Sequence, residues 1–144
     1  MTTITETMSA DHRRCDDIFA LAEEQIAKGD WAKGGAQFEA FRRATEHHFA
    51  MEEEVFFPRF EQRTGQTMGP TQMMRMEHNQ MRQLFSEMAD AVIQQNKERC
   101  LGLSETLMMI MQQHNMKEEQ MLYRMADQVF GSDAASVVEE MQNL

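Results

Sequence analysis

Chemically distinctive residues recur along this chain at a constant offset of 66 positions. The matched pairs are His12 with His78, His48 with His114, Glu52 with Glu118, and Asp30 with Asn96. Aromatic positions follow the same offset, as in Phe57 and Tyr123. Short loops force consecutive helices to be antiparallel, so two copies of one helical hairpin pack as a pseudo-two-fold four-helix bundle.

Apolar residues recur at steps of three and four, which is typical of helices that bury one face. Leu, Met, Gln, Glu and Ala dominate the composition, and turn-forming residues separate the periodic segments. The predicted segments are long helices at about 8–28, 31–63, 71–95 and 97–129, a loop at 64–70, and a short C-terminal helix at about 132–142. Asp30 and Asn96 are the expected N-caps of the second and fourth helices. We therefore expect one all-α domain, residues 1–144, with an antiparallel up-down-up-down bundle over about 8–129.

The charge and apolar content of the 144 residues argue against several classes of protein. A formal net charge of -10 disfavours a nucleic-acid partner, since binding to phosphates relies on clustered Lys and Arg. No segment approaches the run of about 20 apolar residues that crosses a bilayer, and the first residues lack the apolar centre of a signal peptide. Cys15 and Cys100 are too few for a disulfide framework. We expect a cytoplasmic protein that binds neither nucleic acid nor membrane.

The histidines of each predicted hairpin lie at equal distances from its turn. His12 is 18 residues before Asp30, and His48 is 18 residues after it. At a rise of about 1.5 Å per residue, both imidazoles are about 27 Å from the turn, on the same level of two antiparallel helices. The second hairpin repeats this arrangement around Asn96. A glutamate also follows the second histidine of each hairpin by four residues, as Glu52 follows His48, so that both side chains share one face.

These polar residues lie on helix faces that are otherwise apolar. An unpaired carboxylate or imidazole on such a face is costly to bury, so the residues need a common partner. We predict that this partner is a pair of metal ions. The predicted ligands are His12, His48, Glu52, His78, His114 and Glu118. Imidazole and carboxylate suit iron, with zinc or manganese as alternatives, better than calcium. Six protein ligands leave positions open for water, dioxygen, nitric oxide or peroxide.

Other readings of these residues stay open. A single histidine on an apolar helix face is most often a hydrogen-bonded core residue, and a metal-free structural bundle is the corresponding reading of the whole chain. Cys15 is expected as a small core residue, with a role as extra ligand or redox partner as the alternative. His47 breaks the repeat and is expected beside the site. Glu53, Glu54 and Glu119 are expected in solvent, although Glu53 or Glu119 replaces a bridging glutamate if a helix is slightly rotated.

Four segments of the chain resemble the hemerythrin-like, HHE cation-binding family, and the resemblance covers about 8–127. The segments are HHFAMEEEVFFPRF at 47–60, Asp11-His12, Glu77-His78, and the run from His114 to Glu119. The resemblance implies a non-heme di-iron centre inside a four-helix bundle, bridged by carboxylates and by an oxo or hydroxo group. Members of this family carry or sense dioxygen, handle nitric oxide, respond to peroxide or regulate iron.

One position separates this chain from the oxygen-carrying hemerythrins, which place two histidines four apart on the third helix. Here the first of the two positions is Met74, and the second is His78. The pattern is similar to that of symmetric relatives with four histidines and two glutamates. We therefore expect a di-iron protein, a monomer or weak homodimer, that engages a small diatomic molecule or peroxide at open iron positions. The alternatives are a di-iron redox enzyme that consumes peroxide or oxygen, and an iron storage or regulation protein.

Overall fold

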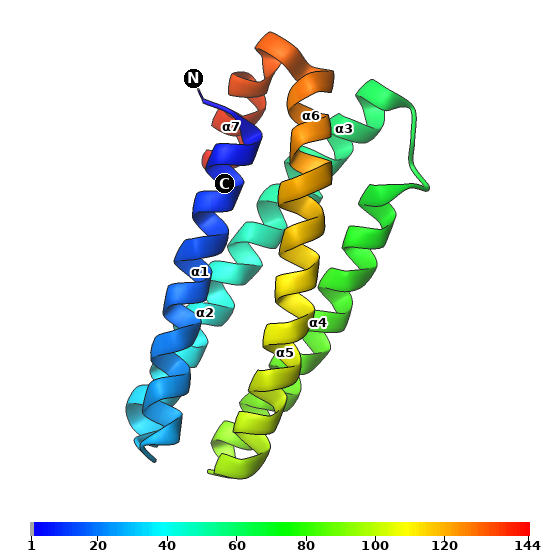
Figure 1. Cartoon of the computed structure of the whole chain (residues 1–144). Coiled ribbons are helices and arrows are strands. Elements are labelled where there is room, and N and C mark those ends of the chain that lie inside the picture. The colour runs from blue at the N-terminus through cyan, green and yellow to red at the C-terminus, as the bar shows by residue number, and fades with distance from the viewer. Residues whose placement is uncertain (1) are drawn as a thin grey trace.

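The structure, a computed structural model, describes residues 2–144, and four long helical segments fill most of it (Figure 1). The first hairpin consists of α1 (Ile4–Ala27), α2 (Trp31–Ala50), a π-helical turn (Met51–Phe56) and α3 (Phe57–Thr64). The second consists of α4 (Pro70–Ile93), α5 (Lys97–Lys117), a π-helical turn (Glu118–Leu122) and α6 (Tyr123–Phe130). A 3-10 turn (Gly131–Asp133) leads into the short α7 (Ala134–Gln142), and no part of the range 2–144 is a strand.

The long helices form an antiparallel bundle, which confirms the predicted fold. Within the hairpins α1 packs against α2 and α4 against α5, while contacts of α1 with α5 and of α2 with α4 join the hairpins. Each long helix therefore has antiparallel neighbours on two sides, in up-down-up-down order. The two tight turns lie at one end of the bundle, and the chain start, α7 and the loop between the hairpins lie at the other (Figure 1). No helix in the described part of the chain is long and apolar enough to cross a membrane.

The tight turns inside the two hairpins are built alike. Asp30 accepts a hydrogen bond from the backbone N–H of Lys33, and Asn96 accepts one from that of Arg99, each at 3.1 Å. Both predicted N-caps are therefore confirmed. The residue before each cap has a positive φ, 78° in the first turn and 53° in the second, and this left-handed conformation closes the preceding helix. Matching turns keep the histidines of the two hairpins at matching heights.

Helix α1 begins at Ile4, four residues before the predicted start. Thr3 Oγ1 accepts a hydrogen bond from the backbone N–H of Glu6 and so caps the helix. Asp127, from α6, binds the same end: its carboxylate accepts from the N–H of Ile4 at 2.8 Å and from that of Thr5 at 3.1 Å. The start of α1 thus combines a local cap, Thr3, with a carboxylate from the other hairpin, and only the second lies beyond a local reading of the sequence.

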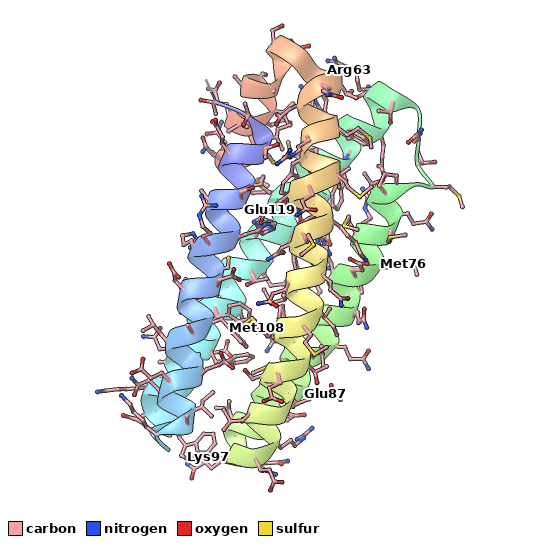
Figure 2. All side chains as sticks on the ribbon, viewed as in Figure 1. Arg63, Met76, Glu87, Lys97, Met108 and Glu119 are labelled. Carbon is pink, nitrogen blue, oxygen red and sulfur yellow. The ribbon has the colours of Figure 1, made fainter. Side chains whose placement is uncertain are left out.

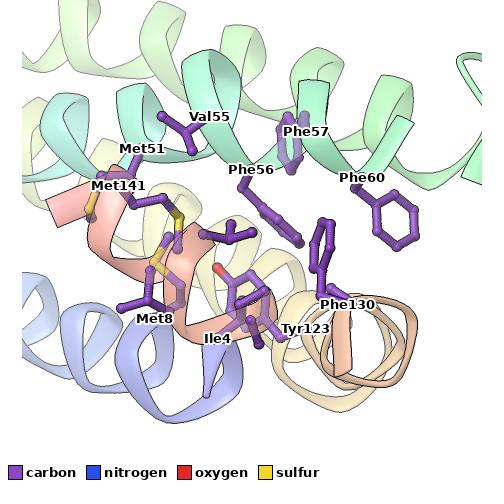
Figure 3. Packing of buried hydrophobic residues seen from close by; sticks show 14 of the residues in the cluster. Ile4, Met8, Met51, Val55, Phe56, Phe57, Phe60, Tyr123, Phe130 and Met141 are labelled. Carbon is purple, nitrogen blue, oxygen red and sulfur yellow. The ribbon is translucent and has the colours of Figure 1, made fainter. Parts of the chain in front are cut away.

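Apolar side chains form two large clusters, one on each side of the predicted ligands. The cluster nearer α7 includes Ile4, Met8, Phe56, Phe57, Phe60, Tyr123, Phe130 and Met141 (Figure 3). The cluster nearer the tight turns includes Cys15, Phe19, Phe38, Phe41, Phe85 and Leu107. Along α1 the order is Met8 in the first cluster, then His12, then Cys15 in the second. The predicted ligands therefore occupy a polar layer between two apolar clusters.

Candidate metal centre

All six residues predicted as ligands meet in this layer. Each is at most 5% exposed: His12, His48, Glu52, His78, His114 and Glu118. They form two groups whose potential ligand atoms lie within 4.8 Å of one another, Glu52, His78, His114 and Glu118 in one and His12, His48 and Glu118 in the other. Because Glu118 belongs to both groups, its carboxylate lies between two pairs of histidines. The buried cluster of His and Glu is therefore arranged as a cation site with two halves.

Four polar atoms in the layer have no hydrogen-bond partner. They are Oε1 of Glu52, Oε2 of Glu118, and Nε2 of His78 and of His114. Buried polar atoms in proteins are nearly always satisfied, so four unsatisfied atoms at one place need an explanation. Imidazole nitrogen and carboxylate oxygen are both ligands of transition metals. The donor set fits metal ions, and ions bound here would satisfy the four atoms together.

Each imidazole in the layer is also held from behind by a second carboxylate. The Nδ1 atoms lie 2.6 to 2.8 Å from these oxygens, in the pairs His48 with Asp11, His114 with Glu77, His78 with Glu53, and His12 with Glu119. Figure 2 shows Glu119 at mid-height in the bundle. When Nδ1–H donates to a carboxylate, Nε2 keeps its lone pair for a metal, and the ring is fixed and made more basic.

These outer carboxylates follow the same repeat as the predicted ligands. Asp11 and Glu77 are 66 positions apart, and so are Glu53 and Glu119. Asp11 and Glu77 each bind a histidine of their own hairpin, whereas Glu53 and Glu119 bind histidines of the other hairpin. The expectation that Glu53 and Glu119 lie in solvent is wrong, because both accept from an imidazole. Their shared offset was the sequence signal that would have found them.

Three further residues that neighbour the predicted ligands in sequence lie outside the buried polar layer. Glu54 is exposed, as expected. His47 is exposed, because adjacent helix positions do not share a face and His48 points inward; it lines a surface pocket together with Asp11, the carboxylate behind His48. Cys15 is buried in the apolar cluster nearer the tight turns, and this burial raises the pKa of its thiol. Its surroundings are those of a small core residue.

Both glutamates of the layer lie in a π-helical turn. The backbone N–H of Phe57 donates to the carbonyl of Glu52, and that of Tyr123 donates to the carbonyl of Glu118, in each case across five residues instead of four. Such turns are rare and often occur at functional sites. A π-helical turn brings residue i+5 next to residue i. Phe57 and Tyr123, which the repeat pairs, are therefore placed beside the two glutamates.

Tyr123 is a functional candidate that the sequence did not reveal. Its hydroxyl donates to Glu52 Oε2 at 2.6 Å and lies 2.9 Å from Glu118 Oε1. The hydroxyl oxygen of Tyr123 also lies 3.3 Å from Nε2 of His12 and 3.3 Å from Nε2 of His48. In a regular α-helix, a residue five positions after Glu118 points to a different face. The π-helical turn is what brings this phenol into the layer.

Charges inside the layer shift the pKa values of its groups. Burial lowers the pKa of His114, but the charges of Glu118 and Glu52 and the hydrogen bond to Glu77 outweigh burial and raise the value to about 9. Burial raises the pKa of Glu53, but hydrogen bonds from His78 and Arg82 outweigh it and lower the value to about 2. A protonated imidazole and a metal ion are alternative positive partners for the same carboxylates. Protons and metal ions therefore compete at this site.

Comparison with known proteins agrees with this geometry. The family model described as "Hemerythrin HHE cation binding domain" matches residues 3–126. No curated protein and no solved structure matches the chain. The matched range contains every residue of the His and Glu layer, together with the carboxylates behind the histidines. The chain therefore belongs to the hemerythrin HHE cation-binding domain family.

Proposed function

We propose that this protein is a non-heme di-iron protein that engages a small molecule, namely dioxygen, nitric oxide or peroxide, for sensing, binding or a stress response. The observation that supports it most is the convergence of buried, unpaired imidazole nitrogens and carboxylate oxygens in one layer. A carboxylate behind every imidazole leaves each Nε2 free to act as a ligand. Histidines with a purely structural role in a core do not each require a carboxylate at Nδ1 and a second nitrogen that faces the same centre.

The two groups of residues indicate how a pair of ions would be shared. His12 and His48 would hold one ion and His78 and His114 the other, with Glu52 and Glu118 between them. Imidazole and carboxylate are suitable donors for iron. Bound iron supplies a redox couple and coordination positions that the side chains leave open. The protein supplies fixed donors and an apolar surrounding.

An apolar pocket is lined by residues that lie one helical turn from two of the predicted ligands, Met74 from His78 and Leu122 from Glu118. It has a volume of about 360 Å³, and its lining includes Met73, Met74, Met121, Leu122 and Met125. Met74 and Leu122 are buried members of the apolar cluster nearer α7. Met74 also lies one turn before His78 on α4. The lining is mostly apolar, with Lys117 as its one charged residue, and a mostly apolar lining suits small uncharged molecules.

Metal analysis and a nitric oxide titration test this proposal. We expect two iron ions per chain after anaerobic loading, and a change in the visible spectrum when nitric oxide is added to the reduced protein. The double substitution Glu52→Ala and Glu118→Ala should abolish both, whereas Glu54→Ala, at an exposed neighbouring position, should change neither. Equal iron content in the double variant and the wild type would contradict the site. Two irons with no response to nitric oxide, dioxygen or peroxide would contradict the small-molecule function.

A further inference from the structure

We infer that Tyr123 is a seventh protein ligand, which binds as a phenolate to the ion shared by His12 and His48. The two ions are then inequivalent, and the small molecule binds at the other one. This inference rests on the di-iron function proposed above. It adds which ion has a further protein ligand and which ion keeps an open coordination position.

The distances around the Tyr123 hydroxyl are those of neighbouring ligands on one ion. Two ligands at right angles, each about 2.1 Å from an ion, lie about 3.0 Å from each other. Tyr123 Oη lies 2.6 Å from Glu52 Oε2 and 2.9 Å from Glu118 Oε1. It lies 3.3 Å from each Nε2 of His12 and His48. The hydroxyl oxygen is therefore about as far from these four donor atoms as a further ligand of the same ion would be.

With His12 and His48 both neutral, hydrogen bonding alone does not account for these contacts. A phenol has one hydrogen, yet Tyr123 Oη faces two carboxylate oxygens and two imidazole nitrogens. In the tautomer in which the Nδ1–H groups of His12 and His48 donate to Glu119 and Asp11, both Nε2 atoms are acceptors, and that of His12 also lies 3.1 Å from Glu118 Oε1. One hydrogen cannot satisfy four acceptors. A cation among them can, with the phenol oxygen as a further donor of electrons to it.

The other half of the layer has no such oxygen. Phe57 occupies the position that the repeat matches to Tyr123, and its ring is stacked near His78 with 5.8 Å between the centroids. A phenyl ring offers no ligand atom. The ion shared by His78 and His114 would therefore keep one more open position than the other ion. The methionine-lined pocket includes Met74, one turn before His78 in this half.

When the phenol binds an ion, its O–H bond would be replaced by a bond from oxygen to the metal. The hydroxyl loses its one proton to water, the oxygen shares a lone pair with iron(III), and no electron is transferred. An anionic oxygen stabilises the more highly charged ion, because attraction increases with charge. We therefore expect the Tyr123 half to hold iron(III) more firmly against reduction than the Phe57 half.

Visible absorption and resonance Raman spectra of the iron(III)-loaded protein test the assignment. The chain contains one tyrosine, so any tyrosinate vibration belongs to Tyr123. We expect a visible charge-transfer band from phenolate to iron, with tyrosinate ring vibrations enhanced on excitation into it. Both should be absent from Tyr123→Phe, which keeps the aromatic ring and all six other ligands. The wild-type spectra decide the question even if this variant does not fold.

The outcomes distinguish the two proposals. Two irons per chain without tyrosinate vibrations would overturn the ligand assignment and leave the di-iron function standing. A chain that takes up no iron would overturn both. Azide, used as a small-anion probe, tests the inequivalence of the ions: a new azide band with the phenolate band retained supports binding at the Phe57 half. Loss of the phenolate band on addition of azide would overturn that part of the inference.

Discussion

Glu53 Oε2 lies 2.6 Å from Nδ1 of His78, so a carboxylate of the first hairpin holds an imidazole of the second. Glu119 and His12 make the reciprocal contact at 2.7 Å. Arg82 fixes Glu53 in turn, with one guanidinium nitrogen 3.0 Å from each carboxylate oxygen. The His78 ring therefore cannot rotate without losing a hydrogen bond. Its orientation toward the centre is established by the protein before any ion binds.

Removing these crossing carboxylates should weaken iron binding without removing a ligand. Glu53→Ala and Glu119→Ala each leave an imidazole without its acceptor, and we expect about 10- to 100-fold lower iron affinity in competition with a chelator. Glu54→Ala is the matched control, since Glu54 is exposed on the same turn. Unchanged affinity in both variants would show that the outer carboxylates do not orient the histidines.

Substitution of an imidazole ligand should lower iron content and stability together. His48→Ala and His114→Ala each remove a donor and leave the remaining polar groups unpaired in an apolar interior. An ion at about 1,000 times its dissociation constant stabilises the folded state by about 4.1 kcal/mol, and this contribution should be lost for the affected ion. Elemental analysis and denaturant unfolding at saturating iron measure both effects. Full iron content in both variants would refute the ligand assignment.

The iron-free protein, prepared with a chelator, should lose stability as the pH rises from 6.5 to about 9. Burial lowers the pKa of His114, but Glu118 outweighs it, so the pKa is raised from 6.5 to about 9. A raised histidine pKa stabilises the folded state fully below pH 6.5, and this stabilisation disappears as the pH passes through about 9. Iron binds the neutral imidazole, so the rise in Tm caused by iron should increase across this window.

Thermal unfolding of iron-free and iron-loaded protein at several pH values in that window measures the difference. His114→Ala should weaken the dependence of the iron-free protein without abolishing it, because His48 and His78, whose pKa values are also raised, remain. Parallel pH profiles for the two forms would contradict competition between protons and iron.

Asp127→Ala should loosen the start of α1 without affecting the centre. Its carboxylate accepts hydrogen bonds from the backbone of Ile4 and Thr5, so its removal should cost about 1 to 2 kcal/mol and speed amide exchange at the start of the helix. Iron content should stay at the wild-type level. The control is Asp133→Ala, which removes an exposed ion pair with Arg63 and should cost less than about 1 kcal/mol. Equal losses in the two variants would contradict the capping role.

The fold and the convergence of the predicted ligands could be read from the sequence because both depend on regular spacing. Asp30 and Asn96 are side-chain caps that act three residues along the chain, so their effect is local. Equal distances from these caps bring His12 and His48 to one level, since an α-helix rises by a constant amount per residue. Regular helices preserve such distances, and the structure preserves them too.

The missed features depend on contacts between hairpins or on irregular backbone. Asp127 reaches α1 from a position more than 100 residues away, so its contribution to the start of that helix has no local pattern, although Thr3 and Glu6 form a local capping pattern there. Tyr123 enters the layer through a π-helical turn, whereas periodic reasoning assumes an α-helix throughout. Glu53 and Glu119 resemble solvated charges on their own helices; the repeat marks them as a pair, but their histidine partners lie on the other hairpin.

The difference between Phe57 and Tyr123 has a consequence for how such a bundle can change. Two separate copies of one hairpin, paired about a two-fold axis, would carry the same residue at both positions, because a single coding segment would specify both. The loop between α3 and α4 places both halves in one chain, where each position mutates independently. A single continuous polypeptide can therefore keep the paired histidines and glutamates alike while its two halves acquire different chemistry.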